Sequence, residues 1–460
     1  MTALAHNVTT AVVGLGLSGM SCLRHLSATD ALVVIDDRDA PANLIDAKRA
    51  FPEAQFFVGQ DAALPHRWHG VERVVLSPGV AANDPVLEGS ENLPRFSDID
   101  LFMLESRAPV IGITGTNGKS TVTAVLGHVL QELGVAVRIG GNLGEPALDL
   151  LTASAQLYVL ELSSFQLEHS KDLALAAATV LNVSADHLDR HGSIDNYAAI
   201  KRRIYALAEF GVSNADDALT HPDKKTGAKG FRCVSFGLAP DARWQLAVRG
   251  DNCELRHKGV VFAQSSDFAL TGQHNLLNLL AAFALIADLD VPGLPSFEEA
   301  PEHYVAAAKD FTGLEHRAEF VRELRGVRYV NDSKATNVGA CVAALSGFTE
   351  SSQNNPNKRV VLLAGGQGKA ADFTPLGLAA ERCVKAAILF GEDAQLLEEA
   401  LAAHTATHRC ADFPEAVETA QRLASAGDTV LLAPACASFD MFVSFTDRGN
   451  RFRDLVEALS

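Results

Sequence analysis

The chain has 460 residues and a formal net charge of −17, with 48% hydrophobic and 21% charged residues. This length predicts about two to four domains, and the acidic charge argues against nucleic acid or an anionic membrane surface as a partner. No apolar run approaches the roughly 18 residues of a spanning helix, and the first residues lack the basic segment of a signal peptide. The seven scattered cysteines form no disulfide framework or metal motif, which favours the cytoplasm.

Strand-type runs alternate with helix-type segments over much of the chain, which predicts α/β units with parallel sheets. The runs are 10–13, 31–35, 74–76, 110–114, 157–160, 179–182, 360–363, 386–390 and 429–432. Between residues 231 and 270, short runs separated by turns predict an antiparallel patch without a helix. The polar segment 351–358 is expected to be a surface loop.

The first motif follows the first run directly. Residues 14–19 read Gly-Leu-Gly-Leu-Ser-Gly, and Asp36 ends the next run, as in a dinucleotide-binding fingerprint. Such a turn needs only a phosphate at a helix N-terminus, so NAD, a UDP pyrophosphate or a purely structural turn all remain open. The segment 77–79, Ser-Pro-Gly, ends a third run and is either part of a ligand-binding edge or an ordinary turn.

The second motif is the most informative one. A strand-type run leads into a Gly-rich turn and then a helix-type segment, which predicts a phosphate-binding loop. We expect Lys119 to reach the outer phosphates and the Ser120 hydroxyl to hold Mg²⁺. Ile113 stands where the strict motif has its first glycine, and a Gly-rich loop without a ligand is the alternative. The predicted nucleotide-binding residues here are Gly115, Thr116, Asn117, Gly118, Lys119, Ser120 and Thr121.

Three further polar residues follow in the same unit. Glu161 ends the run 157–160, and an acid at that position commonly completes a Mg²⁺ shell beside a phosphate-binding loop. His187 follows another run on the same expected sheet edge, which favours a ligand over a structural role. Lys201 lies in a helix expected over 197–208, and the sequence alone favours a solvated basic helix face.

The remaining polar candidates lie towards the C-terminus. Asn275 could be a helix N-cap, or the amide of Asn278, one turn further along the same helix, could instead read an adenine edge. Three loops that follow strand-type runs carry lysines or hydroxyls, at 331–337, 365–369 and 434–440. Because loops after parallel strands meet at one edge of a sheet, these are predicted to form one site for an anionic small molecule.

Taken together, these phrases resemble the Mur ligase family along essentially the whole chain. The similar segments are GLGLSG, TGTNGKST, LELSSFQLE, LNVSADHLDR, GQHNLLN, FTGLEHR, NDSKATN, GGQGKAADF and PACASFDMF. The phosphate-binding loop and HNLLN are family-wide features. NDSKATN and PACASFDMFVSFTDRG are similar to the members that add D-glutamate.

The resemblance implies three domains, in residues 1–97, 98–313 and 314–460. They would be a Rossmann-like UDP-binding domain, a central ATP-binding domain with a parallel sheet and the antiparallel patch, and a C-terminal Rossmann-like domain that brings the amino acid. It also implies a monomer that joins D-glutamate to UDP-N-acetylmuramoyl-L-alanine, driven by ATP and Mg²⁺ at two sites, with no NAD, nucleic acid or membrane partner.

The resemblance also assigns roles to individual residues. Lys201 matches a carbamylated lysine, which would hold one Mg²⁺ with His187, while Ser120 and Glu161 hold the other. Lys119, Glu161, His187 and Lys201 form the implied catalytic set. The UDP-substrate set is Gly16, Leu17, Ser18, Asp36, Arg38, Ser77, Gly79, Asn142 and His187. ATP contacts beyond the loop are Asn278, Arg317, Asp332 and Lys334, and glutamate contacts are Thr336, Lys369, Ser438 and Phe445.

Two positions depart from the family pattern. Asp37 replaces a neutral hydroxyl residue, and Gln367 replaces an acid. The alternatives to a D-glutamate ligase are a sister ligase such as a folylpolyglutamate synthase, an NAD-dependent dehydrogenase built on the first motif, and a non-catalytic nucleotide-binding regulator.

Overall fold

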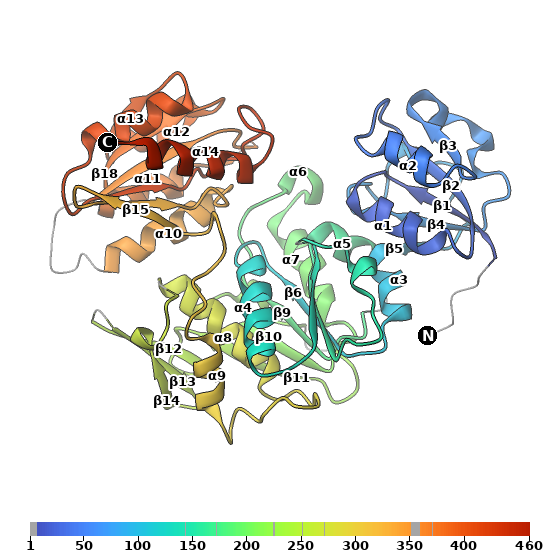
Figure 1. Cartoon of the computed structure of the whole chain (residues 1–460), viewed down its shortest axis with the longest axis horizontal. Helices are drawn as coiled ribbons and strands as arrows, with labels where there is room; N and C mark the ends of the chain where they lie inside the picture. Colours follow the sequence, from blue (N-terminus) through green and yellow to red (C-terminus); the bar gives the residue numbers. More distant parts are fainter. Residues whose placement is uncertain are drawn as a thin grey trace.

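The computed structural model describes residues 7–142, 144–171, 173–223, 226–250, 252–270, 272–350, 359–369 and 371–460. It has three β-sheets flanked by helices, and the first and third units lie on the same side of the central one (Figure 1). This confirms the predicted three-part α/β fold, whereas the boundaries at 97/98 and 313/314 stay predictions. The predicted loop 351–358 lies outside the described residues. In the part that is described, no helix is long and apolar enough to cross a membrane.

The first sheet is parallel, with the order β3-β2-β1-β4-β5. Its strands are β1 (Thr9–Val13), β2 (Ala31–Asp36), β3 (Gln55–Val58), β4 (Arg73–Leu76) and β5 (Arg95–Ser97), and its helices are α1 (Leu17–Leu26) and α2 (Leu44–Ala50). The strand order reverses between β1 and β4, where ligands of such sheets bind. A Cβ at Gly19 would lie 2.0 Å from the Gly14 carbonyl oxygen, so α1 can approach the turn only with glycine there.

The central sheet has the order β14-β13-β12-β11-β10-β9-β6-β8-β7. Its strands are β6 (Val110–Thr114), β7 (Val137–Gly141), β8 (Leu157–Glu161), β9 (Ala177–Val180), β10 (Phe210–Asn214), β11 (Arg232–Gly237), β12 (Trp244–Arg249), β13 (Asn252–His257) and β14 (Val260–Gln264). The antiparallel patch is confirmed for β12 to β14, but β11 pairs parallel with β10, so the prediction for its first strand was wrong. The run predicted at 179–182 is β9, which ends at Val180 because the chain leaves the sheet there for the polar loop that carries His187.

Helices cover both faces of the central sheet. They are α3 (Asp98–Glu105), α4 (Lys119–Glu132), α5 (Ser164–His169), α6 (Leu188–His191), α7 (Ile194–Arg202), α8 (Gln273–Ile286) and α9 (Pro301–Ala308). Alternate side chains of β6 serve the two faces: Ile111 and Ile113 pack in the core with α4 and α8, whereas Val110 packs in the opposite core. That second core continues without a break into the first sheet, where it includes Val12 and Leu23.

The third sheet has the order β15-β16-β20-β17-β18-β19, and only its β15 edge is antiparallel. Its strands are β15 (Glu319–Leu324), β16 (Val327–Asn331), β17 (Val360–Gly365), β18 (Val384–Phe390), β19 (Ala406–Arg409) and β20 (Thr429–Leu432). Its helices are α10 (Val338–Glu350), α11 (Thr374–Cys383), α12 (Ala394–Leu401), α13 (Phe413–Leu423) and α14 (Phe445–Ala458). Each face has its own core, and neither core includes residues of the central sheet.

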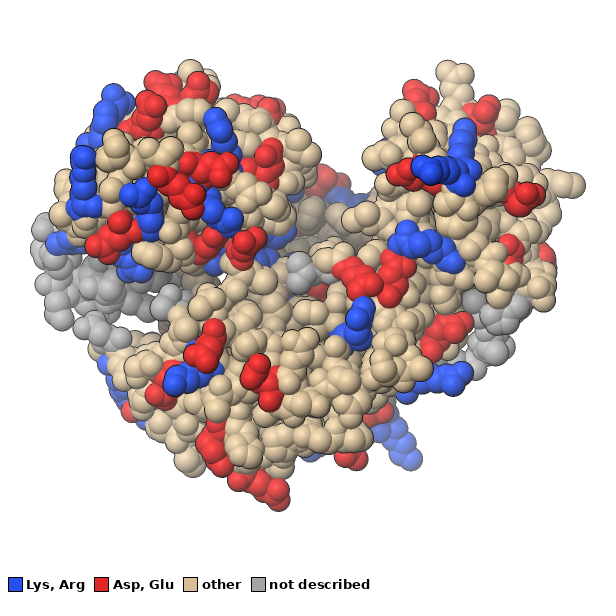
Figure 2. Space-filling view, in the orientation of Figure 1, with Lys and Arg blue, Asp and Glu red and all other residues tan. Residues whose placement is uncertain are grey.

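The surface between the upper units is hollowed. Figure 2 shows this hollow between the first and third units, and on the visible face acidic and basic side chains are interspersed over all three units. An anionic ligand would therefore be held by local groups in the hollow rather than by an extended basic area.

Candidate active site

The phosphate-binding loop joins β6 to α4, as predicted. Gly118 caps α4 with φ +82°, a left-handed conformation that favours glycine. A Cβ at this position would also lie 2.6 Å from the Asn278 side-chain oxygen, so α8 packs directly against the loop. Asn278 therefore lies beside the loop, while its contact with ATP stays a prediction. The prediction that Asn275 is a helix N-cap was wrong, because α8 begins at Gln273 with Gly272 as its N-cap and Asn275 lies in the first turn.

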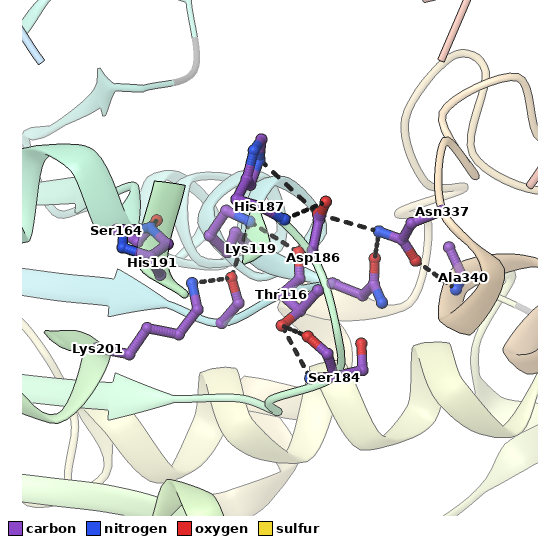
Figure 3. A network of polar contacts seen from close by, with 12 residues as sticks. Thr116, Lys119, Ser164, Ser184, Asp186, His187, His191, Lys201, Asn337 and Ala340 are labelled. Carbon is purple, nitrogen blue, oxygen red and sulfur yellow. Dashed lines mark hydrogen bonds and ion pairs between the residues drawn. The ribbon is translucent and has the colours of Figure 1, made fainter. Parts of the chain in front are cut away.

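Two lysine side chains converge on one backbone oxygen of this loop. The amino groups of Lys119 and Lys201 donate to the Gly115 carbonyl at 2.9 and 2.8 Å, and Lys119 also donates to Thr116 O (Figure 3). Burial, together with the neighbouring Lys119 charge, holds the pKa of Lys201 well below its usual range. A neutral amine is nucleophilic, which is the form that reacts with carbon dioxide to give a carbamate.

The interpretation of Lys201 as a residue on a solvated face was wrong. Its side chain is 1% exposed, because α7 turns this residue towards the loop and not towards water. Its amino group lies 4.4 Å from the centre of the Tyr197 ring. The helix expected over 197–208 begins earlier, at Ile194 behind the N-cap Ser193, and gives way after Arg202 to a 3-10 turn.

Glu161 lies at the end of β8, next to the loop in the parallel sheet, as predicted. One carboxylate oxygen accepts from the Asn142 side-chain amide at 2.6 Å. The other oxygen, Oε2, is buried and has no hydrogen-bond partner among the described residues. An unpartnered buried carboxylate oxygen is costly unless a cation or donor completes it.

His187 lies on the other side of the same cavity. It has φ +52°, a left-handed conformation that is uncommon for histidine and is found preferentially at functional sites. Its ring packs edge-on against Phe165, with 4.9 Å between ring centres, and burial lowers its pKa, which favours the neutral imidazole that binds metals. The preceding Asp186 accepts from Asn337 of the third unit at 3.4 Å.

The third unit contributes charged side chains to the loop. Arg317 donates to the Ser120 hydroxyl oxygen at 2.8 Å, from just before β15. Lys334 stacks over the Phe445 ring at 3.9 Å, and burial together with the Arg317 charge lowers its pKa to about 8. Burial raises the pKa of Asp332 to about 6, although the Arg317 charge opposes this.

The three predicted C-terminal loops meet at one edge of the third sheet. Ala437 pairs with Gln367, and the Ala435 amide donates to the Ala335 carbonyl at 2.9 Å, so the loops form one surface. Thr336 lines the cavity that contains Lys119. The loops also carry Lys369 and Ser438, and Phe445 begins α14 a few residues later. None of these three residues lines the three cavities of the site.

A cavity of about 660 Å³ lies at the reversal point of the first sheet. Asp36, at the end of β2, accepts from the Leu15 amide and the Arg38 guanidinium. Burial alone would raise the pKa of Asp36, but these hydrogen bonds lower it on balance. Eight of the predicted UDP-substrate residues line this cavity: Gly16, Leu17, Ser18, Asp36, Arg38, Ser77, Gly79 and Asn142. The ninth, His187, lines the neighbouring one.

The first-sheet cavity is joined to the loop cavities by shared walls. Asn142 lines both the first-sheet cavity and a cavity of about 200 Å³ that contains Lys119, Glu161, His187 and Lys201. A further cavity of about 310 Å³, lined by Asn278 and Asp332, shares Gly118, Arg317 and Lys334 with it. The two strand–turn–helix sites thus open on one central polar space.

Comparison with known proteins is consistent along the whole chain. Family models match residues 8–93 (Mur ligase MurD-like, N-terminal domain), 113–286 (Mur ligase middle domain) and 316–436 (Mur ligase, glutamate ligase domain). A UDP-N-acetylmuramoylalanine--D-glutamate ligase of Marinobacter nauticus is 41% identical over 463 residues, covering 100% of both chains. The same-named protein of Methylococcus capsulatus is 42% identical, covering 98% of this chain and 94% of its own. The chain belongs to the Mur ligase family.

Solved structures of more distant proteins share the fold of this Mur ligase. MurF from Acinetobacter baumannii superposes with a TM-score of 0.62 at 18% identity, covering 97% of this chain and 93% of its own. MurC from Thermotoga maritima gives a TM-score of 0.60 at 18% identity, covering 98% and 100%. Membership of this family favours the ligase interpretation over the dehydrogenase alternative.

The residues around the loop fit magnesium ions. Glu161 Oε2 is a buried anionic oxygen without a partner, and the Ser120 hydroxyl lies at the N-terminus of the adjacent α4, both oxygen ligands of the kind Mg²⁺ prefers. Within the described ranges no group of three His, Cys, Asp or Glu side chains could hold a metal. A site here therefore needs hydroxyl, phosphate or modified-lysine ligands as well.

Several residues at this site were not singled out from the sequence. Asp186 and Asn337 connect the central and third units, and Tyr197 packs on the Lys201 amine. Arg448 of α14 is fully buried behind the C-terminal loops. Asn337 and Asp186 stood in motifs already quoted, but their pairing depends on tertiary structure and leaves no local signal.

Proposed function

We propose that this Mur ligase joins D-glutamate to UDP-N-acetylmuramoyl-L-alanine at the expense of ATP. The observation that carries the proposal is the continuous space described above, in which two nucleotide-type sites open on one cavity containing Lys119, Glu161 and Lys201. Such a space brings the terminal phosphate of one nucleotide to a group carried by the other. The names of the relatives at about 40% identity support the choice of D-glutamate and of the UDP-linked acceptor.

ATP binds with its base in the cavity beside Asn278 and its phosphates on the loop amides. Lys119 and Arg317 place positive charge beside the outer phosphates, where charge builds up during transfer. Ser120 and Glu161 would hold one Mg²⁺, and His187 with Lys201 in its carbamylated form would hold a second. Bound Mg²⁺ neutralises phosphate charge at the transferred group.

The acceptor lies with its diphosphate at the N-terminus of α1, where Leu17 and Ser18 line the first-sheet cavity. Its carboxylate reaches the space between Asn142 and His187 and attacks the γ-phosphorus of ATP, giving an acyl phosphate and ADP. The neutral amine of glutamate then attacks the acyl carbon, and phosphate leaves. Thr336, Lys369, Ser438 and the Phe445 region hold the glutamate carboxylates.

Phosphate release tests the proposal. Purified protein is assayed with ATP, Mg²⁺ and UDP-N-acetylmuramoyl-L-alanine, in parallel with D-glutamate, L-glutamate or no amino acid. We expect release that requires both co-substrates and is fastest with D-glutamate. Equal release without the UDP compound, or with a folate acceptor in its place, would contradict the assignment. The cytoplasmic location and the monomeric state stay predictions. Gel filtration with light scattering is the simplest check of the monomeric state.

A further inference from the structure

Arg190 of α6 connects the first and central units without lining any of the three cavities. Its Nη2 donates to the Val80 carbonyl at 3.1 Å, and its Nη1 lies 3.5 Å from the Gly79 carbonyl. Both acceptors belong to the loop after β4 in the first unit. The same guanidinium pairs with Glu168 of α5, from Nε at 3.2 Å and from Nη2 at 2.9 Å. The pair is mostly shielded, with side-chain exposures of 18% and 21%.

The Val80 carbonyl has a second donor from the central unit. Nε2 of His169, at the end of α5, lies 2.8 Å from this oxygen. Burial lowers the pKa of His169, which favours the neutral ring, and because a carbonyl oxygen can only accept, this contact needs the ring proton on Nε2. Two side chains of the central unit therefore converge on one backbone oxygen of the first unit, and a carbonyl with two donors is held in position and direction.

The loop fixed in this way is a wall of the first-sheet cavity. Ser77, Gly79 and Val80 line that cavity, and the Ser77 hydroxyl donates to the Gly14 carbonyl of the glycine turn at 2.7 Å. A displacement of the 79–80 backbone would therefore be passed to the turn at the N-terminus of α1. This is the turn on which a diphosphate would rest.

Arg190 also packs on an aromatic ring beside the proposed phosphoryl-transfer centre. The guanidinium stacks over the Phe165 ring at 5.3 Å, and the same ring packs against His187 at 4.9 Å. His187 is also the N-cap of α6, and its carbonyl accepts from the Arg190 amide at 3.1 Å. Arg190 thus contacts the wall of one cavity while it packs on the aromatic ring that supports a residue of the next.

We propose that Arg190 is a positioning residue that sets the distance between the nucleoside-diphosphate site and the phosphoryl-transfer centre. This inference rests on the proposed function, because the ligand that spans the two cavities is the UDP-linked acceptor. Arg190 lines none of the three cavities in which the acceptor and ATP are proposed to bind. It determines whether an acceptor anchored at the first sheet presents its carboxylate beside His187.

The test compares Arg190→Gln with Arg190→Lys. Binding of UDP-N-acetylmuramoyl-L-alanine is measured by calorimetry, and KM values for the acceptor and for ATP are determined separately. Loss of a charged donor to carbonyl oxygens predicts a Kd and KM for the acceptor raised about 10- to 100-fold in Arg190→Gln. The KM for ATP should stay within twofold, and Arg190→Lys should recover part of the acceptor affinity because one donor still reaches the loop.

Arg203→Gln is the matched control. Arg203 donates to the Glu168 and Ser170 carbonyls at 2.9 and 2.7 Å, so it supports α5 in the same way, but both of these acceptors belong to the central unit. We expect it to lower the melting temperature while leaving the acceptor Kd within twofold. Wild-type acceptor affinity in folded Arg190→Gln, or equal losses for acceptor and ATP in both variants, would overturn the inference. A wild-type protein that does not bind the UDP compound would instead overturn the proposed function.

Discussion

Arg448 offers the sharpest test of how the C-terminal loops are held together. Its guanidinium donates to the Ser333 hydroxyl and carbonyl, at 3.0 and 2.9 Å, and to the carbonyls of Gly365 and Cys436 at 3.3 and 3.2 Å. These acceptors belong to the loops after β16, β17 and β20. Burial lowers the pKa of Arg448 to about 10, so the group stays charged at neutral pH. One buried cation therefore ties together all three loops.

Arg448→Met keeps the apolar stem and removes every donor. Leaving about three buried acceptors unsatisfied costs roughly 1–3 kcal/mol each when the loops cannot relax, so we expect a loss of about 4 kcal/mol in the free energy of unfolding of the third unit. This corresponds to a melting temperature lower by roughly 8–16 °C for a unit of this size. The predicted glutamate site is built from these loops. The loss of one hydrogen bond's worth of positioning, about 1.4 kcal/mol, should therefore raise the KM for glutamate at least about tenfold, while the KM for the UDP acceptor stays unchanged.

Thermal unfolding, steady-state kinetics and amide hydrogen exchange of residues 333–337, 365–369 and 434–440 measure these effects. Arg322→Met is the control, since Arg322 also donates to backbone carbonyls, those of Val456 and Glu457, but at the far end of α14. It should destabilise slightly without changing the glutamate KM. Normal exchange protection and normal glutamate KM in Arg448→Met would refute the reasoning.

Three other predictions follow from the central unit. Lys119→Ala should abolish phosphate release, because Lys119 supplies the positive charge of the loop at the site proposed for the outer phosphates; wild-type turnover would contradict the scheme. Lys201→Ala should be inactive but partly restored by short carboxylates, which replace the carbamate oxygens; activity without added carboxylate would argue against that role. Asp98 is buried at the start of α3, and burial raises its pKa to about 6, opposed by hydrogen bonds from Ser18 and Gln166. The folded chain then binds more protons than the unfolded one between about pH 4 and 6, so stability falls as pH rises through this window. Asp98→Asn should gain up to about 3 kcal/mol in urea unfolding at pH 8 and little at pH 4.5, and an equal effect at both would exclude this cause.

The parts of the site that follow from local sequence were predicted well. The runs at 110–114 and 429–432 coincide with β6 and β20, and the Gly-rich turn before Lys119 begins a helix as expected. These features depend on neighbours within a few residues, since glycine, strand propensity and the helix N-terminus act locally. The same holds for Asp36 and Glu161, each placed by the end of its own strand.

The wrong predictions have a common physical cause. Lys201 was predicted to be solvent-exposed because a lysine on a short helix usually is. Only the packing of α7 against the loop buries its side chain. Asn275 read as a cap because the sequence offers a capping residue, although the preceding Gly272 takes that position. Arg190 and Arg448 gave no local signal, because most of their acceptors are backbone carbonyls, and those of Arg448 lie up to 115 residues away. Backbone acceptors leave no residue type to recognise.

The three units are joined in two different ways, and this bears on which of them can move during a catalytic cycle. The first and central units share one continuous apolar core, whose separation would expose buried side chains such as Leu23 and Phe102. No hydrophobic cluster of the described residues spans the central and third units, which meet through polar pairs such as Arg317 with Ser120 and Asn337 with Asp186. Such pairs contribute about 0.5–1.5 kcal/mol each and can be exchanged for ligand oxygens at little cost. The amino-acid site proposed on the third unit would therefore lie on the part of the molecule that separates at the lower cost, whereas the proposed acceptor site lies on a unit joined to the central one by a shared apolar core.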